Sequence, residues 1–560
     1  MVIGLLAQVA PLPPIPPPAA PAPLTAQVAE PPSTQPLPEP DLSPLPPPDE
    51  LLPPPESENA PELVPELPEQ IFVERFVVEG NTVIDDEALA EVLSPFTGRS
   101  LSFAELLQAR TAVTQRYVEA GYITSGAFIP PQTMSEDVVV IQVLEGQIAA
   151  IDVEVDGRLN SGYVRRRLQR AATPVLNADD LLAALQLLQV DPLIDTISAE
   201  LLAGVQPGTS LLNVEVVEAD TFDITLQTDN GRSPSVGSFR RGVTVSQGNV
   251  LGLGDGISVS YANTDGSDAV DLSYRIPLNA AGGTFTTDIG FTESEIIEDP
   301  FNFLDIQSES RFYEFTYRQP IVQTPAREFA LSVTASRRES ESEFLDALPF
   351  PTLGADEEGR TRVSALRFAQ EWTQQGSRQV IAARSQFSLG LDAFDATVND
   401  AGPDARFFAW RGQAQWVRLL EEDLLLLVRG DVQLADNSLV PLERFGLGGS
   451  RTVRGYRQDE LLTDSGVLLS SEVRLPVLRV RQVDGLLQVV PFVDVGHGWN
   501  LAAPDPDPAV LASVGLGLLW QMGDRLNARV DFGFPLVDTD SEGSSLQEDG
   551  VHFNINLRLF

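Results

Sequence analysis

The chain of 560 residues has no cysteine, no lysine and only two histidines, His497 and His552. The missing cysteine excludes disulfides, thiol nucleophiles and cysteine-ligated zinc. The missing lysine excludes P-loop nucleotide hydrolysis, protein-kinase and Schiff-base chemistry, because each of these needs a lysine amine. Two histidines are too few to build a histidine-rich metal site. We therefore expect no catalytic residues, no metal and no cofactor.

Basic charge and long apolar runs are also scarce. There are 37 basic against 80 acidic residues, which gives a formal net charge of −43. Nucleic-acid binding is not expected, since it depends on basic side chains that neutralise phosphates. No run of about 18 apolar residues occurs, so no transmembrane helix is predicted. If the chain spans a membrane, it must do so as a closed β-barrel, because only helices and closed barrels satisfy all backbone hydrogen bonds in lipid.

Residues 1–70 are rich in proline and acidic side chains and contain no basic residue. We predict that this segment is disordered, because such a composition cannot bury enough apolar surface to fold. A tether and a plain linker are both consistent with it. Met1–Ala10 is apolar but lacks the basic residues of a signal peptide. We expect the natural start of an exported protein to lie further upstream.

Two similar units come next, at 71–147 and 148–219, and each has the order strand, helix, helix, strand, strand. The first unit opens with one predicted strand over Phe72–Val78, and its second helix begins at the capping box Ser102-x-x-Glu105. The pattern predicts two small α+β modules. Such a module leaves a sheet edge free to pair with an extended peptide. The alternative is that the modules are spacers that only dock on the C-terminal part of the chain.

From residue 220 to Phe560 the helical pattern gives way to period-two alternation. We count sixteen candidate strands, and an even number is typical of a single-chain bacterial barrel. Tyr313, Phe315 and Tyr317 share one face, as lipid-facing aromatic residues do. A β-sandwich would also alternate, but this number of strands favours a barrel. We predict a 16-stranded antiparallel transmembrane β-barrel.

A glycine-rich segment between two of these strands contains Val453-Arg454-Gly455-Tyr456. On a later strand, alternation places Phe492, Asp494 and Gly496 on the face opposite the apolar one, and the same reasoning turns Glu472 inward. We predict that the loop 441–465 folds back into the lumen. Its arginine can then pair with these carboxylates, because a guanidinium stays charged and bonds a carboxylate through two N–H groups. The alternative is a solvated surface loop.

The sequence Val453–Tyr456, followed by Phe492-x-Asp494-x-Gly496, resembles the paired motifs of the outer-membrane superfamily that includes BamA. Within that superfamily, Tyr122–Gln132 and Leu144-Glu-Gly146 resemble the TpsB transporters of two-partner secretion. These are the haemolysin and filamentous-haemagglutinin exporters of the ShlB, FhaC and HecB type. The resemblance covers Ile71 to Phe560.

The resemblance implies two POTRA modules in the bacterial periplasm, followed by a barrel in the outer membrane. It implies a translocase that exports, and can activate, a large TpsA-like exoprotein, which the POTRA modules capture and the lumen conducts. The family's arginine and aspartate fix the loop inside the barrel, which gives these roles to Arg454 and Asp494. Other implied partners are outer-membrane lipid and the barrel-assembly machinery, which reads a C-terminal aromatic such as Phe560.

Two rival functions are weighed against export. A BamA-like insertase that assembles other barrels is the alternative, but insertases usually carry more than two POTRA modules and the Tyr122–Gln132 motif argues against it. A passive porin is disfavoured by the modules. Since no nucleotide-binding motif is present, we expect the energy for export to come from folding of the client outside the cell.

Overall fold

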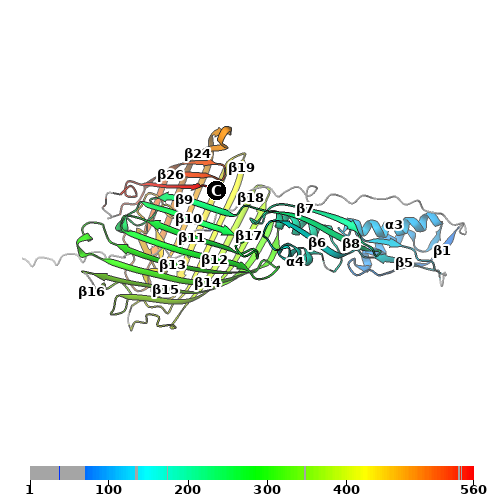
Figure 1. The fold of residues 1–560 in the computed structure, drawn as a ribbon, viewed down its shortest axis with the longest axis horizontal. Helices are drawn as coiled ribbons and strands as arrows, with labels where there is room; N and C mark the ends of the chain where they lie inside the picture. Colours follow the sequence, from blue (N-terminus) through cyan, green and yellow to red (C-terminus); the bar gives the residue numbers. More distant parts are fainter. Residues whose placement is uncertain are drawn as a thin grey trace, which may run out of the picture.

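The computed structural model describes residues 70–560, except 133–136, 173, 346–347, 401, 540–542 and 544, together with residue 37. The predicted disordered segment 1–70 and the expectation about Met1–Ala10 therefore lie, apart from residues 37 and 70, outside the described residues. Figure 1 shows a barrel with two smaller modules in line at one of its ends. In the described part of the chain, no helix has the length and apolar character needed to cross a membrane.

The first module packs two helices on a small sheet. Its elements are β1 (Ile71–Val73), β2 (Arg75–Glu79), α2 (Asp86–Leu93), β3 (Arg99–Leu101), α3 (Phe103–Glu119), β4 (Gly126–Phe128) and β5 (Val138–Leu144). The predicted capping box is present, since Ser102 Oγ accepts from the Glu105 N–H while the Glu105 carboxylate accepts from the Ser102 N–H at 2.7 Å. This backbone bond and the Arg99 guanidinium lower the pKa of Glu105 to about 2.

The prediction of a single strand over Phe72–Val78 is wrong, because this segment forms two strands, β1 and β2. The chain leaves the ladder at Glu74, whose N–H donates to the carbonyl of Asp137 at 2.8 Å. As a result β1 pairs antiparallel with β3, whereas β2 pairs parallel with β5. The main sheet of the module therefore has the order β2-β5-β4.

The second module repeats this plan with longer strands. Its elements are β6 (Gln147–Asp156), α4 (Ser161–Ala171), α5 (Ala178–Gln189), β7 (Ile194–Ala203) and β8 (Thr209–Glu218), and the sheet order is β6-β8-β7. Leu181, Leu185 and Leu212 are fully buried between the helices and the sheet. Asn177 accepts from the Asp179 N–H at the start of α5 and donates to Ala120 O at 3.0 Å, so this cap also joins the two modules.

The Leu144-Glu145-Gly146 turn is fixed to the first module and contacts the second, whose Leu176 N–H donates to Gly146 O at 2.8 Å. The Glu145 carboxylate accepts from the Thr82 N–H at 2.6 Å and from the Tyr117 hydroxyl at 3.1 Å. The Gly146 N–H donates to Ser125 Oγ at 2.9 Å, which ties this turn to the Tyr122–Gln132 segment. The two sequence motifs that resembled TpsB proteins are therefore bonded to one another, and the Leu144–Gly146 turn lies at the contact between the modules.

Among the described residues, sixteen long antiparallel strands form one closed barrel. β9 closes it by pairing with both β10 and β27. The two-residue strand β16 (Leu348–Pro349) pairs only with β15. The fold class predicted from the sequence, two α+β modules before a 16-stranded barrel, is confirmed. The barrel strands are β9 (Phe222–Asp229), β10 (Arg240–Gly248), β11 (Gly256–Asn263), β12 (Ser267–Pro277), β13 (Thr284–Glu295), β14 (Gln307–Thr324), β15 (Arg327–Phe344), β17 (Arg360–Gly376), β18 (Gln379–Leu391), β19 (Phe408–Glu421), β20 (Leu424–Ala435), β23 (Ser465–Val480), β24 (Gly485–Trp499), β25 (Val510–Met522), β26 (Leu526–Pro535) and β27 (Val551–Arg558).

The two faces of the barrel wall differ in chemistry. On β24, Phe492 and Asp494 are buried inside the barrel, whereas Val493 and Val495 are exposed outside. Aromatic side chains continue the outer face, and the rings of Phe285 and Phe315 stack with centroids 6.5 Å apart. An apolar outer face and a polar inner face are what a barrel in lipid requires.

The second module docks on the barrel turn between β10 and β11. The Asn160 N–H donates to Gly252 O at 2.9 Å, and Asn249 Nδ2 donates to a Glu218 carboxylate oxygen at 2.5 Å. Burial acts to raise the pKa of Glu218, but this bond and two backbone N–H groups outweigh burial and lower the pKa. A carboxylate that stays ionised and fully bonded at this contact fixes the module against the end of the barrel.

Candidate functional site: a loop held inside the barrel

The link 436–464 between β20 and β23 runs into the barrel from the end opposite the modules. It contains a short hairpin, β21 (Phe445–Leu447) paired with β22 (Leu461–Thr463). Because β23 begins at Ser465, the loop predicted at 441–465 ends one residue earlier. Its apolar residues pack on the inner wall as one buried cluster, made of Phe445, Leu447, Val453, Tyr456, Leu461, Leu468 and Leu511.

Arg454, at the tip of the loop, lies against Asp494 on β24. Its Nε and Nη2 atoms donate to the two Asp494 oxygens at 2.7 and 2.8 Å, and its backbone N–H donates to Asp494 at 3.2 Å. Ser470 Oγ also donates to Asp494, at 2.7 Å. Arg454 is 3% exposed and Asp494 is 0% exposed. The buried aspartate thus accepts four hydrogen bonds, which fixes the tip in one orientation.

Glu472 on β23 forms the second half of this cluster. It accepts from Arg454 Nη1 at 2.9 Å, from Arg474 Nη2 at 3.0 Å and from Arg529 Nη2 at 2.7 Å. Arg529 in turn donates to Asp531 at 2.7 Å. The Arg454–Asp494 pair is therefore part of a larger network of charged side chains on the wall. A buried ion pair needs such additional hydrogen bonds to offset the loss of hydration.

The other motif residues shape the backbone around this pair. Gly455 has φ of +96°, and a Cβ there would lie 2.9 Å from the carbonyl carbon of Gly533 on β26. Only glycine accommodates both that angle and that approach. The Tyr456 hydroxyl bonds to Ala512 O at 2.8 Å and to Val537 O at 2.9 Å.

The strand motif Phe492-x-Asp494-x-Gly496 receives the loop. The Phe492 ring lies 3.6 Å below the Arg454 guanidinium, which is a cation–π contact. At Gly496 a Cβ would lie 2.7 Å from Leu447 and 3.2 Å from Val453. The structure therefore brings together all eight residues singled out in the sequence: Val453, Arg454, Gly455, Tyr456, Glu472, Phe492, Asp494 and Gly496.

His552, on β27, was not identified from the sequence as part of the site. Its Nε2 accepts from the Gly455 N–H at 3.0 Å, and the ring is 1% exposed. Accepting at Nε2 requires the neutral imidazole with its proton on Nδ1. The signal was available, since alternation along Val551–Arg558 turns His552 to the lumen, but nothing local indicated that it meets Gly455.

A second contact at the base of the loop was also missed. Glu443 accepts from Arg367 at 2.7 and 3.0 Å and from Arg338 at 3.4 Å. Arg338 also donates to Glu314 at 2.7 Å. These arginines lie on β15 and β17, whereas the tip is held by β23, β24, β26 and β27. The loop is thus fixed to both sides of the barrel and crosses the lumen.

This arrangement can hold or release a loop, because it joins opposite charges that water could also solvate. Within the described ranges, no group of three or more histidine, cysteine, aspartate or glutamate side chains is placed to hold a metal.

Comparison with known proteins decides the family. A family model for the haemolysin secretion/activation protein ShlB/FhaC/HecB matches residues 208–519, more than half of the chain. The chain belongs to this family. A second model, for the ShlB-type POTRA domain, matches residues 71–146.

Individual relatives of this ShlB/FhaC/HecB member are distant but cover most of its length. The heme/hemopexin transporter protein HuxB of Haemophilus influenzae is 22% identical over 484 residues, 81% of each chain. The outer membrane transporter CdiB of Dickeya dadantii is 22% identical over 475 residues, again 81% of each chain. The solved structure of CdiB from Escherichia coli shares the fold with a TM-score of 0.69 and 20% identity, over 89% of this chain and 93% of that one.

The protein is therefore an outer-membrane transporter of two-partner secretion, with POTRA modules in the periplasm, and the class implies a secreted TpsA-like partner. The resemblance noted in the sequence, the function and the location are confirmed. A BamA-type insertase is less supported, because the matching family models describe secretion proteins.

Proposed function

We propose that the transporter exports its exoprotein as an extended chain, which the POTRA modules receive and the barrel lumen conducts past the loop 436–464. The observation that supports this most is the position of the loop, which crosses the lumen and is held on both sides by buried ion pairs. A client in the lumen competes with the loop for the same space. Export then requires the tip to leave the wall.

Arg454, Asp494 and Glu472 act as the latch in this proposal. A latch must hold the loop when no client is present and release it without covalent chemistry. Buried ion pairs suit both needs, since their attraction is offset by a comparable cost of removing the charges from water. When a hydrated client enters, the released guanidinium and carboxylates regain water, which lowers the cost of opening.

The POTRA sheets offer edges for the client. In the first module β4 lies at an edge of the β2-β5-β4 sheet, and its Phe128 is exposed. In the second module β6 and β7 lie at the edges. Pairing of an extended peptide with such an edge uses backbone hydrogen bonds, which suits a client of any sequence.

Two further partners belong to the proposal. Outer-membrane lipid covers the apolar outer wall, and the barrel-assembly machinery reads the C-terminal aromatic. Phe560 is well exposed and its ring lies 6.1 Å from that of Phe222, where the last strand meets the first. Folding of the client outside the cell supplies the energy, since the chain has no nucleotide-binding motif.

A reversible disulfide tests whether the loop must move. The chain has no cysteine, and a Cβ at Gly231 would lie 3.5 Å from Ser450 Oγ in the loop, so the double variant Gly231→Cys with Ser450→Cys can form a bridge. The client of the transporter is first identified as the protein that is no longer secreted when the gene for the transporter is deleted. We expect secretion of that protein to stop on oxidation and return on reduction, while both single variants secrete normally.

Equal secretion by the oxidised and reduced double variant would contradict the proposed loop movement. General loss of outer-membrane barrels on deletion, in place of loss of one secreted protein, would instead support the insertase.

A further inference from the structure

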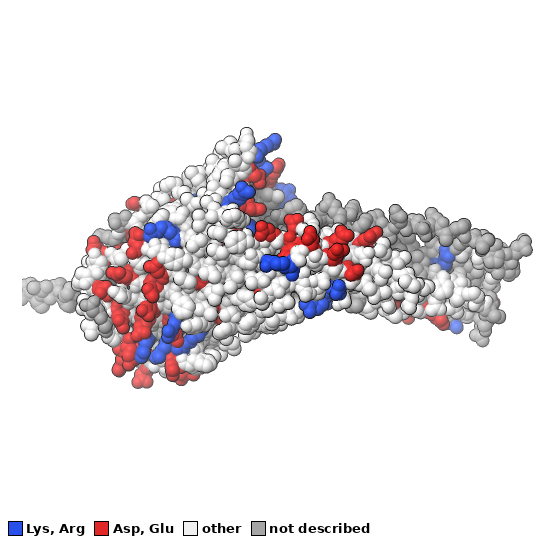
Figure 2. Space-filling model, viewed as in Figure 1, with Lys and Arg blue, Asp and Glu red and all other residues white. Residues whose placement is uncertain are grey.

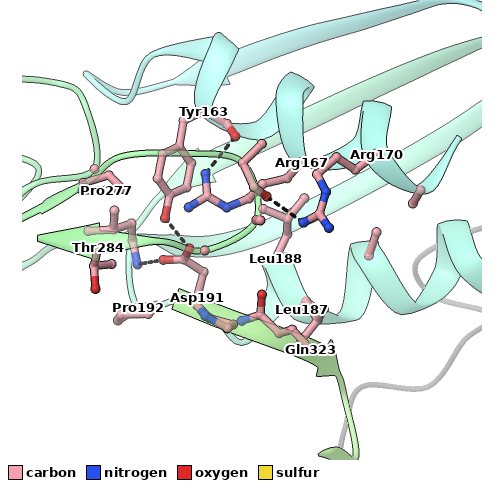
Figure 3. Close-up of a pocket in the computed structure, with 18 of the residues that line it drawn as sticks. Tyr163, Arg167, Arg170, Leu187, Leu188, Asp191, Pro192, Pro277, Thr284 and Gln323 are labelled. Carbon is pink, nitrogen blue, oxygen red and sulfur yellow. Dashed lines mark hydrogen bonds between the residues drawn. The ribbon is translucent and has the colours of Figure 1, made fainter. Parts of the chain in front are cut away.

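A cavity of about 600 Å³ lies where the second POTRA module meets the periplasmic end of the barrel. Figure 3 shows α4 and α5 on one side of it and the ends of barrel strands on the other. Its wall is mixed: Leu187, Leu188, Pro277 and Ile321 supply apolar surface. Its charged lining residues are Arg167, Arg170 and Arg275 together with Asp180, Asp191 and Asp255, so the surplus of positive charge at this place comes from the exposed arginines of α4. The latch formed by Arg454, Asp494 and Glu472 lies in the lumen, and none of these residues lines this cavity.

Helix α4 has an unusual charge for this chain. It carries Arg165, Arg166, Arg167 and Arg170 and no acidic residue, in a protein whose net charge is −43. Arg166 and Arg170 are exposed. Figure 2 shows basic atoms in the region where Figure 1 places α4, next to an acidic surface on the same module.

Two of these arginines are positioned toward the barrel side of the cavity. The Arg167 guanidinium lies 3.5 Å over the Tyr163 ring and donates to Tyr163 O at 3.0 Å. The Tyr163 hydroxyl donates to Asp191 at 2.6 Å, and burial together with this aspartate raises the pKa of the phenol, which keeps it a neutral donor. Arg170 Nη1 donates to Ala280 O at 3.4 Å in the turn between β12 and β13. Figure 3 shows both side chains directed into the cavity.

The barrel surface next to this cavity is apolar. Tyr317 is exposed on the outer face of β14, and Ile321, further along the same strand, is 58% exposed and also lines the cavity. In the turn between β12 and β13, Leu278 is exposed as well. Arginines therefore lie directly below the rim of the lipid-facing wall, at the depth of the headgroups of the periplasmic leaflet.

We propose that this cavity and α4 bind the phosphate headgroup of an anionic phospholipid from the periplasmic leaflet. Guanidinium groups bond phosphate oxygens through paired N–H groups, and basic pockets at a membrane surface attract anionic headgroups. The apolar rim at Ile321 receives the start of the acyl chains. An acidic peptide would match the charge but not this rim, which continues into the lipid-facing wall.

The bound lipid would join the second POTRA module to the membrane as well as to the barrel. The proposal goes beyond export of a client, since it requires only that the barrel lie in the outer membrane. Its failure would leave the loop mechanism untouched, and failure of the loop mechanism would leave it untouched.

The test uses the full-length protein in detergent micelles, with dioleoylphosphatidylglycerol as the anionic probe and dioleoylphosphatidylcholine as the zwitterionic one, and bound lipid is counted by native mass spectrometry. We expect wild type to retain the anionic lipid in preference. Arg166→Gln with Arg170→Gln should weaken its binding roughly thirtyfold, at about 1 kcal/mol for each arginine near an anionic surface.

Two controls accompany this variant. Arg75→Gln with Arg116→Gln removes the same charge from the first POTRA module and should bind as wild type does. Arg166→Lys with Arg170→Lys keeps the charge and should retain most of the binding. Heat-modifiable migration of the barrel on gels verifies that each variant is folded.

Four results would overturn the proposal. Equal binding of the two lipids would show that the site does not select anionic headgroups. Equal loss of anionic-lipid binding in the α4 variant and the first-module variant would show that α4 does not form the site. Displacement of the lipid by millimolar inorganic phosphate would show a free-anion site. A photo-crosslinker at Gln323 that captures the exported client and no lipid would show a peptide site.

Discussion

The loop inside the barrel is held at two places, and the two contacts have opposite polarity. At the tip the loop supplies the cation, Arg454, and the wall supplies the carboxylates of Asp494 and Glu472. At the base the loop supplies the carboxylate, Glu443, and the wall supplies Arg367 and Arg338. Both contacts are buried, and each leaves its charges with several hydrogen bonds.

The inversion of sign explains how this link adopts one position inside the barrel. If the loop shifted so that the tip met β15 and β17, Arg454 would face arginines and Glu443 would face carboxylates, and like charges in a buried site repel. Each wall also holds charges of the other sign, Arg474 and Arg529 at the tip and Glu314 at the base, but its net charge favours one end of the loop. The contacts differ in strength as well, because the tip adds the Phe492 ring and a backbone N–H bond to its ion pairs.

The largest effect is expected from breaking the tip. Glu472→Gln removes the carboxylate shared by Arg454, Arg474 and Arg529, and leaving buried charges without their partner costs about 3–5 kcal/mol. The loop should leave the wall more often, and its arginines should then be cut by trypsin added to intact cells. Glu357→Gln, an exposed change on the barrel, serves as the control. Trypsin resistance equal to wild type would show that Glu472 does not hold the tip.

The base contact should be weaker. Glu443→Gln takes both strong bonds from Arg367, whereas Arg338 keeps Glu314, so we expect a loss of about 2–3 kcal/mol, as for hydrogen bonds to charged groups. Combined with Glu472→Gln, it tests whether the contacts are independent. Additive decreases in the free energy of loop opening, taken from trypsin cleavage rates, would mean that both contacts break in the same opening, so that the loop leaves as one unit. A double variant cleaved no faster than Glu472→Gln alone would mean that the tip opens while the base contact stays in place.

A smaller effect is expected at His552. His552→Leu leaves the Gly455 N–H without an acceptor in a buried site, at a cost of about 1–3 kcal/mol. His552→Gln should weaken the hold on the loop less, since an amide oxygen can accept the same hydrogen bond from the Gly455 N–H. Channel openings in planar bilayers should therefore be more frequent for the leucine variant than for the glutamine variant. More frequent openings in the glutamine variant than in the leucine variant would argue that the imidazole only fills space and does not act as a hydrogen-bond acceptor.

The smallest effect should come from Arg457, further out in the loop. It pairs with Glu298 at 2.9 Å and with Glu548 at 3.4 Å, and it is partly exposed. Arg457→Gln should change loop opening by about 0–1 kcal/mol, and the change should shrink further at high salt. A loss as large as that of Glu472→Gln, measured by the same trypsin assay, would mean that exposure does not separate strong from weak contacts in this loop.

Sequence reasoning succeeded where a pattern is local. Period-two alternation assigned Asp494 to the inside and Val493 to the outside, because side chains alternate along any strand. It failed where one residue breaks a run, as at Glu74, whose N–H turns to Asp137 and splits the predicted strand in two.

Glu443 shows the limit most clearly. Arg367 and Arg338 precede it by 76 and 105 residues, and Gly455 and His552 are 97 residues apart. Alternation turns Arg338, Arg367 and His552 inward, but an inward direction does not say which part of the loop each of them meets. That depends on the number of strands, their tilt and the register at which the barrel closes.

The sequence alone determined the class of the protein: period-two alternation, the absence of long apolar runs and the two motifs led to a membrane barrel with periplasmic modules. These features are local, so the chain carries them without reference to its fold. Only the tertiary structure decided which charges meet, that the loop crosses the lumen with opposite polarity at its two ends, and that the arginines of α4 lie beneath the lipid-facing rim. Those contacts join distant segments, and closure of the barrel and docking of the second module bring them together.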